Sequence, residues 1–378
     1  MRKQIQLLFL ILIFGTIPFQ AQTEVRTDIN IPDIPGYKTL KCDFHMHTVF
    51  SDGNVWPTIR TIEAWREGLD AIAITDHIEY LPHKKDINID FNRSYEIANS
   101  ESEKHQVTVI KGGEITRRMP PGHLNGIFLN DVSKLKTEKW EDAVKAAYDQ
   151  GAFIFWNHPG WKGQQKDGVS KWYDEHSMIL ENGWLHGIEV VNEREYYPEV
   201  HQWCLDRNLT MMSNSDIHDP TNMFYEIHKG DHRPVTLVFA MDNTETSIKE
   251  ALFDRRTVVY AEDFLVGREM FLKPIFEKSI KISETEFELT GNSTKHIQIK
   301  NCSDIDYKLV LEDTNEFVSV PEEIILYGNK IVLFWIKAKK DDIFESQKIK
   351  INYKVENLKV KPNEGLPVIL EFDITKKK

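Results

Sequence analysis

Short apolar runs alternate with amphipathic segments over residues 37–260. The runs have the length and composition of β-strands, and several of the segments between them repeat apolar residues at helical spacing. Strands are expected at 39–44, 70–74, 107–111, 124–129, 152–156, 187–191, 209–213 and 235–240. Helices are expected at 58–67, 139–150, 198–207 and 246–255. Repeated strand–helix units predict an α/β fold with a mainly parallel sheet, and this many units in one core favour a closed (β/α) barrel.

One connection breaks this alternation. The run that ends at Glu114 is joined to the run that begins at His123 by an Arg-Arg-Met-Pro-Pro-Gly link at 117–122. This link is too short for a helical crossover, so an antiparallel hairpin is predicted. The hairpin would bring His123 close to Glu114.

The pattern changes after about residue 270, where β-type runs follow one another without a clear helix. These runs lie at 280–289, 296–299, 307–311, 331–336, 348–355 and 367–372. Their spacing predicts a small all-β, sandwich-like domain. We therefore assign residues 23–268 to the barrel and residues 269–378 to a C-terminal β-rich domain with a structural or docking role.

Residues 1–22 have the pattern of a secretory signal: a basic start, an apolar run at 7–14 and a small residue, Ala21, before polar chain. The apolar run is shorter than the ~20 residues that a membrane-spanning helix needs. The pattern predicts signal cleavage, a mature chain without a membrane span, and a periplasmic or secreted protein.

The charge balance argues against a nucleic-acid partner. Lys and Arg total 47 against 59 Asp and Glu, a formal net charge of -12, whereas nucleic-acid binding needs a cationic face. A small phosphate ester stays compatible with this charge, because bound metal cations invert the local potential.

Imidazoles and carboxylates follow the predicted strands. They are His45, His47, His77, Glu114, His158, Asp216 and His218. In extended backbone His45 and His47 point the same way, so the pair is suited to chelating one divalent ion. A lone His-x-His motif is weak evidence, but the other donors follow strands too, where a barrel assembles its active site. The pattern predicts a metal centre.

Three nearby acidic residues have more than one interpretation. Asp52 either reaches the same mouth or is a turn residue before Gly53. Asp43 and Asp76 are expected to hold imidazole ligands from behind, with a capping role as the alternative.

The order of these motifs resembles the polymerase and histidinol phosphatase (PHP) superfamily of metal-dependent hydrolases. The motifs are Asp-Phe-His-Met-His-Thr, Ser-Asp-Gly, Ile-Thr-Asp-His, Gly-Gly-Glu, Gly-His, Asn-His-Pro-Gly and Ser-Asp-Ile-His, over roughly residues 38–260. The chain looks most similar to a branch of exported phosphodiesterases that act on small organic phosphodiesters. A related branch contains carbamate and amide hydrolases.

The resemblance implies a distorted barrel of the PHP type and two to three divalent ions. It assigns His45, His47, Glu114 and Asp216 to one ion, Glu114, His123 and His158 to a second, and Asp52, His77 and His218 to a third. Asp52 stands where some members have a histidine. Mixed imidazole and carboxylate ligands suit zinc, manganese or iron.

The chemistry expected of such a cluster is hydrolysis. Cations ~3.5–4 Å apart clamp the attacking and leaving oxygens, and a bound water loses its proton near neutrality. The predicted reaction converts a small phosphodiester to a monoester by a metal-bound hydroxide, with Glu114, Asp216 and His218 as metal-held groups. Arg117 and Arg194 are candidate phosphate contacts, or solvated loop residues.

Two other functions stay open. An amide, carbamate or carboxylic ester hydrolase would use the same cluster, since divalent ions also polarise carbonyl groups. A noncatalytic exported metal-binding protein would show a cluster without an open coordination position.

Near the ligands, Trp161 either walls the pocket or packs in the core.

Overall fold

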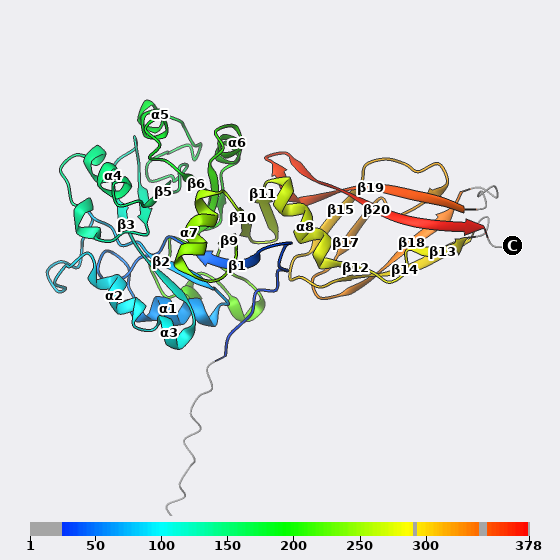
Figure 1. The fold of residues 1–378 in the computed structure, drawn as a ribbon, viewed down its shortest axis with the longest axis horizontal. Helices are drawn as coiled ribbons and strands as arrows, with labels where there is room; N and C mark the ends of the chain where they lie inside the picture. Colours follow the sequence, from blue (N-terminus) through cyan, green and yellow to red (C-terminus); the bar gives the residue numbers. More distant parts are fainter. Residues whose placement is uncertain (1–24, 290–292, 340–345, 377–378) are drawn as a thin grey trace, which may run out of the picture.

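The structure is a computed structural model that describes residues 25–289, 293–339 and 346–376. The predicted signal segment at 1–22 lies outside the described residues. Figure 1 shows an α/β unit beside an elongated all-β unit, with α8 (Glu269–Ser279) between them. Within the described ranges, no helix is both long and apolar enough to cross a membrane.

The α/β unit contains every strand and helix predicted for it, with ends shifted by a few residues. Its strands are β1 (Lys38–Asp43), β2 (Ala71–Ile74), β3 (Thr108–Ile115), β4 (Leu124–Ile127), β5 (Phe153–Trp156), β6 (Gly187–Asn192), β7 (Glu195–Tyr196), β8 (Thr210–Asn214), β9 (Val235–Ala240), β10 (Thr257–Ala261) and β11 (Phe264–Gly267). Its helices are α1 (Pro57–Arg66), α2 (Arg93–Asn99), α3 (Ser102–His105), α4 (Trp140–Tyr148), α5 (Asp174–Glu181), α6 (Pro198–Asp206) and α7 (Glu245–Phe253). Strands β7, β10 and β11 and helices α2, α3 and α5 were not predicted.

The sheet has a parallel core with antiparallel insertions. Strands β1, β2 and β3 pair in parallel, as do β5, β6 and β8. Between these groups β4 runs antiparallel to both β3 and β5, with Glu114 opposite Asn125, which confirms the predicted hairpin. Strand β9 also runs antiparallel to β1, so the sheet is more mixed than predicted.

Side chains complete the barrel between β8 and β9. Among the described residues no backbone ladder joins these two strands. Instead the buried Thr236 hydroxyl accepts a bond from the Ser213 amide at 2.9 Å and donates to the Ser213 carbonyl at 2.8 Å. The Thr257 hydroxyl donates to the Met211 carbonyl at 2.9 Å. The barrel is therefore distorted, because threonine hydroxyls replace part of its hydrogen-bond ladder.

An apolar cluster fills the end of the barrel where β1 begins, and polar residues occupy the opposite end. Alternate residues of β1, such as Leu40 and Cys42, join alternate residues of β2, β5 and β9 in this cluster. Ile248, Ala251 and Leu252 of α7 add to it. Because α7 follows Ala240, which pairs with Lys38 at the start of β1, α7 covers the end opposite the predicted ligands.

The C-terminal unit is an all-β sandwich, as predicted. Its strands are β12 (Ile280–Ile282), β13 (Glu286–Leu289), β14 (Thr294–Asn301), β15 (Tyr307–Leu311), β16 (Val318–Ser319), β17 (Glu323–Leu326), β18 (Ile331–Ala338), β19 (Ser346–Lys361) and β20 (Glu364–Lys376). One sheet has the order β12-β14-β18-β16. In the other, β19 pairs in parallel with β11, so the two units share one hydrogen-bonded sheet.

The expectation of no helix after residue 270 is wrong, because α8 lies there. Its buried Phe271, Leu272, Ile275 and Phe276 recur at helical spacing. Pro274 inside the helix obscures this pattern, since proline normally breaks a helix interior.

Candidate metal centre

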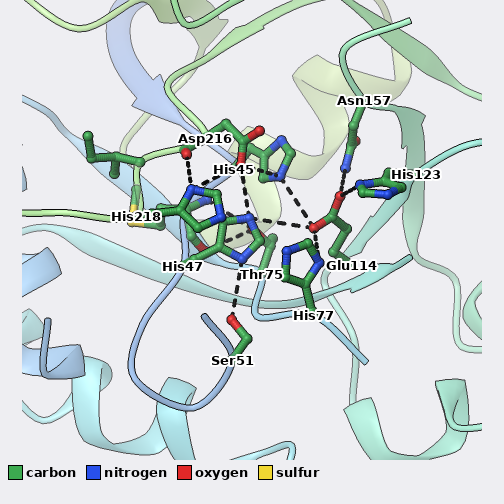
Figure 2. Close-up of polar contacts among 12 residues, drawn as sticks. His45, His47, Ser51, Thr75, His77, Glu114, His123, Asn157, Asp216 and His218 are labelled. Atoms are coloured by element: carbon green, nitrogen blue, oxygen red, sulfur yellow. Dashed lines mark hydrogen bonds and ion pairs between the residues drawn. The ribbon is translucent and has the colours of Figure 1, made fainter. Parts of the chain in front are cut away.

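The predicted ligands converge at the carboxyl end of the parallel strands (Figure 2). His45 and His47 follow β1, His77 follows β2, His123 precedes β4, His158 follows β5, and Asp216 and His218 follow β8. Glu114 lies inside β3 rather than after it, because β3 is longer than its apolar run. The strand ends thus bring together residues that are far apart in the sequence.

Glu114 lies at the centre of the cluster and is fully buried. Its Oε2 lies 2.6 Å from His77 Nδ1 and 3.5 Å from His47 Nε2. Its Oε1 lies 2.8 Å from His123 Nδ1 and accepts a bond from the Asn157 amide at 3.0 Å. The hairpin therefore places His123 against Glu114, and the two carboxylate oxygens face different imidazoles.

Asp216 forms a second centre beside Glu114. Its Oδ1 lies 2.9 Å from His47 Nε2 and 3.1 Å from His45 Nε2, and its Oδ2 lies 3.7 Å from His158 Nε2. The backbone of Asp216 has a φ of 52°, in the left-handed region that non-glycine residues rarely adopt. The Asp216 amide bonds the His45 carbonyl at 2.9 Å, which helps hold this strained conformation.

Asp52 is both a turn residue and part of the mouth. Its Oδ1 lies 3.2 Å from His218 Nε2 and 3.4 Å from His77 Nε2. The turn depends on Gly53, because a Cβ there would lie 2.6 Å from the His47 carbonyl carbon. The loop bends back over His47 and carries Asp52 with it.

The ligand atoms form groups in which all members lie within 4.8 Å of one another. The groups are His47, Asp52, His77 and His218; His45, His47 and Glu114; His45, His158 and Asp216; and His77, Glu114 and His123. This division differs from the allocation that the resemblance implied. For example, His158 lies with His45 and Asp216, since its ring stacks on that of His45 with centres 5.8 Å apart and its Nε2 lies 3.7 Å from Asp216 Oδ2.

Some buried polar atoms in this cluster make no well-aligned hydrogen bond, and this tests whether cations fit. Among the described residues, His45 Nε2 and Glu114 Oε2 are buried without such a bond, although Asp216 Oδ1 and His77 Nδ1 lie close to them. An unsatisfied buried polar atom costs about 1–3 kcal/mol, and a bound cation would satisfy both atoms. Since the donors are imidazoles and carboxylates, the residues fit divalent ions.

The electrostatics of the cluster keep its carboxylates ionised. Burial acts to raise the pKa of Glu114, but His77, His123 and His45 hold this pKa well below its usual range. Burial lowers the pKa of His47 to about 3, helped by His218 and His77. Burial also acts to lower the pKa of His77, but Glu114 and Asp52 raise it to about 10. A cation that binds His77 must therefore displace a proton.

Glu189 supports the cluster and was missed in the sequence. Its buried carboxylate lies 2.9 Å from His45 Nδ1 and accepts the His158 amide at 2.7 Å. The side-chain amides of Asn192 and Asn214 complete its bonds at 2.8 and 2.9 Å. Glu189 thereby turns His45 Nε2 towards Asp216, as outer partners of metal ligands do. The sequence signal that could have identified Glu189 is its position as the one charged residue of the otherwise uncharged strand β6.

Asp43 and Asp76 hold loop backbone rather than imidazoles. Asp43 Oδ1 accepts the Ser215 amide at 3.1 Å, and Asp76 Oδ1 accepts the Thr48 amide at 2.7 Å. The expected imidazole contacts are absent from the described bonds of both residues, so their capping alternative is the better description. The expectation failed because other groups occupy these carboxylates: Asp43 also pairs with Arg233 at 3.1 Å, and Asp76 also accepts the Ser51 hydroxyl at 2.7 Å.

Two hollows open beside Asp216, and Glu193, Glu195 and Asp216 line both. One has a volume of about 170 Å³ and is also lined by His218 and Phe224. The other has a volume of about 240 Å³ and is also lined by Trp161, Lys162 and Tyr197. The Trp161 ring centre lies 5.4 Å from that of His158, and Trp161 is 48% exposed. Trp161 therefore walls the site and does not pack in the core.

The two candidate arginines lie in different environments. Arg194 lines the smaller hollow, where it bonds Asp231 at 2.7 Å and lies 4.9 Å from the centre of the Tyr225 ring. Arg117 pairs with Glu79 at 2.8 Å and donates to the carbonyls of Thr137 and Glu138. Arg117 lines neither hollow, so the structure brings Arg194, and not Arg117, beside the ligands.

The fold is shared with a solved structure from Bacteroides vulgatus ATCC 8482. That structure is a two-domain protein containing a predicted PHP-like metal-dependent phosphoesterase. It is 44% identical, the match covers 93% of this chain and 100% of that chain, and the TM-score is 0.88. This chain belongs to the PHP-like metal-dependent phosphoesterase family.

Other comparisons place the PHP-like chain in a wider context. A family model described as an Ig-like domain matches residues 280–371, in agreement with the sandwich. An amidohydrolase from Chromobacterium violaceum, solved with bound sulfate and no metal, is 15% identical with a TM-score of 0.35. That match covers 48% of this chain and 88% of that chain. A search of curated proteins found no match.

Proposed function

We propose that this PHP-like protein is a metal-dependent phosphodiesterase that hydrolyses small organic phosphodiesters to monoesters. The observation that carries this proposal is the pair of hollows that share Asp216. A phosphodiester bears two organic groups on one phosphorus atom, and a monoester bears one. With the phosphoryl group at the cluster, each hollow has room for one organic group.

The residues of the cluster fit this chemistry. Divalent cations, when bound, neutralise phosphoryl oxygens and lower the pKa of water towards 7. His45, Glu114 and Asp216 would hold such ions, because each offers a ligand atom to one or more of the donor groups at the mouth. Lys162 and Arg194 place a cation in each hollow, which favours an anionic phosphoryl group. Trp161 and Tyr197 offer apolar surface to an organic group.

One observation favours the second candidate, an amide, carbamate or carboxylic ester hydrolase. Glu193 and Glu195 line both hollows, and Asp231 already pairs with Arg194. These carboxylates offset part of the cationic charge that would select phosphate. The third candidate, a noncatalytic metal-binding protein, is less favoured because open hollows adjoin the ligands.

A substrate panel tests these candidates. The protein is reconstituted with zinc, manganese or iron and assayed with bis(4-nitrophenyl) phosphate, 4-nitrophenyl phosphate, and 4-nitrophenyl acetate and carbamate esters. We expect kcat/KM for the diester to exceed that for the monoester by at least about tenfold, or ~1.4 kcal/mol. The His45→Ala variant should lose this activity. Faster turnover of the carbonyl esters would support the second candidate, and undiminished turnover by His45→Ala would exclude the metal mechanism.

We also propose that the protein acts after export, on the basis of the signal pattern at 1–22. Mass spectrometry of the protein expressed in a Gram-negative host should detect a mature chain that begins after Ala21. Intact chain retained in the cytoplasm would contradict this proposal.

A further inference from the structure

Arg60 of α1 joins the loops that follow β1 and β8 through hydrogen bonds to their backbone. Its side chain is fully buried, with 0% exposed. Nε donates to the His47 carbonyl at 2.9 Å, and Nη2 donates to the carbonyls of Ile217 and His218 at 2.9 and 2.7 Å. Nη1 donates to the Asp219 carbonyl at 2.9 Å. One guanidinium thus binds the backbone of both loops.

These two loops supply three of the four members of one ligand group. His47 and His218 belong to the same group, together with Asp52 and His77. Their rings stack with centres 4.2 Å apart and an interplanar angle of 21°. Only loops in a fixed relative position bring these rings together, and Arg60 binds the carbonyl oxygens of both residues.

The charge of Arg60 is balanced locally. Glu63 Oε2 accepts a bond from Arg60 Nη1 at 2.9 Å, and Glu63 Oε1 accepts the Thr221 amide at 2.9 Å. A buried charge is costly unless it is paired and fully hydrogen-bonded, and Arg60 meets both conditions. Its planar fork of donors also imposes a geometry that the single ammonium of lysine does not.

Arg60 has no described bond to the other ligand loops. Its hydrogen bonds go to residues 47, 63, 217, 218 and 219. His158 and His123 are carried by other strands, and Glu189 and Asn157 hold the side chains of His45 and Glu114. The support of the cluster is therefore divided between separate residues.

We propose that Arg60 is a positioning residue for one ion site, formed by His47, Asp52, His77 and His218. The inference rests on the proposed metal occupancy but not on which bond is hydrolysed. Substitution of an outer partner typically weakens metal binding by about 10–100-fold. We expect a loss of this size at one site, while the groups centred on His158 and on His123 keep their ions.

Metal titration of the full chain tests this inference. The variants are Arg60→Met and Arg60→Lys, with Arg268→Met as the control. Arg268 donates to the Cys204 and Leu209 carbonyls at 3.3 and 3.0 Å, so it also holds loop backbone, but away from the ligands. Metal content is measured by plasma mass spectrometry after dialysis against zinc or manganese, and stepwise affinity by calorimetry.

The expected result is one binding step weakened by about 10–100-fold in both Arg60 variants, with the remaining steps unchanged. The Arg268→Met variant should bind all ions as the wild type does. Full ion content at wild-type affinity in the folded Arg60 variants overturns the inference, and so does equal weakening of every step. If Arg60→Met does not fold, Arg60→Lys decides the outcome. A wild-type chain that binds no ion overturns the proposed function itself.

Discussion

The mouth of the barrel and the surroundings of Asn301 in the C-terminal sandwich bury polar groups in opposite ways. At the mouth His45, His47 and Glu114 are fully buried, and His45 Nε2 and Glu114 Oε2 make no well-aligned hydrogen bond among the described residues. In the sandwich the buried Asn301 donates to the Ile305 and Leu326 carbonyls and accepts from Ser303. The mouth thus presents buried polar atoms that a cation would bond, whereas these polar groups of the sandwich are satisfied within the chain.

The same contrast holds for apolar packing. In the sandwich, buried residues alternate with exposed residues along β14 from Ile297 to Asn301. Phe334 of β18 packs against Tyr353 and Phe372. At the mouth, imidazoles and carboxylates occupy positions that apolar side chains fill at the other end of the barrel. Local rules of packing are broken at the mouth, as is usual where a site is built.

The strongest test of this contrast removes the central charge of the mouth. Glu114→Gln keeps the size of the side chain but removes the carboxylate that faces His77, His123 and His47. Because bound metals contribute several kcal/mol to catalysis, kcat/KM for the diester should fall by about 10³-fold or more. Diester hydrolysis and metal content per chain are measured. The exposed Glu181 of α5 provides the control Glu181→Gln, and a fully active, metal-replete Glu114→Gln would contradict the prediction.

The next test weakens the sandwich and leaves the mouth intact. Phe334 is fully buried, and replacing such a residue by alanine costs about 3–5 kcal/mol in the free energy of unfolding. Urea denaturation of Phe334→Ala followed by circular dichroism should show this loss, with metal content per folded chain unchanged.

Leu333→Ala in the same strand is the matched control, since Leu333 is 61% exposed. Its free energy of unfolding should change by no more than about 0.5 kcal/mol. Equal losses in the two variants would show that burial in the sandwich does not determine its stability.

The smallest expected effect concerns a buried histidine outside the cluster. His176 stacks on Trp156 with ring centres 3.6 Å apart, its Nε2 lies 2.7 Å from the Pro121 carbonyl, and its Nδ1 accepts the Tyr173 amide. Burial lowers the pKa of His176 to about 4 against the opposing effect of the Pro121 carbonyl. The imidazole is therefore neutral in the folded chain above that pH.

The unfolded chain takes up this proton near the ordinary pKa of 6.5. The contribution of His176 to stability is thus complete above pH 6.5 and is lost as the pH falls towards 4. One proton changes the slope of unfolding free energy against pH by about 1.4 kcal/mol per unit. His176→Gln should reduce the wild-type slope by this amount in metal-free protein, measured by urea denaturation at several pH values. An unchanged slope would contradict the assignment.

Much of this site was predictable, because its residues lie at positions marked by local patterns. His45 and His47 follow an apolar run, and the short link after Glu114 required a hairpin that brings His123 back to it. Residue patterns failed where a local signal was ambiguous, as at Pro274 in α8. They also failed for Glu189 and Arg60, whose partners lie far away in the sequence.

Hydrophobic periodicity and turn chemistry act over a few residues, so local patterns alone set the order of the elements and the supply of imidazoles and carboxylates at strand ends. Folding in three dimensions sets which donors share a group, how β8 meets β9, and which buried side chains hold the ligands. Those features depend on contacts such as His45 with Glu189 and Arg60 with Ile217. Such contacts form only when the barrel closes and packs side chains from distant segments against one another.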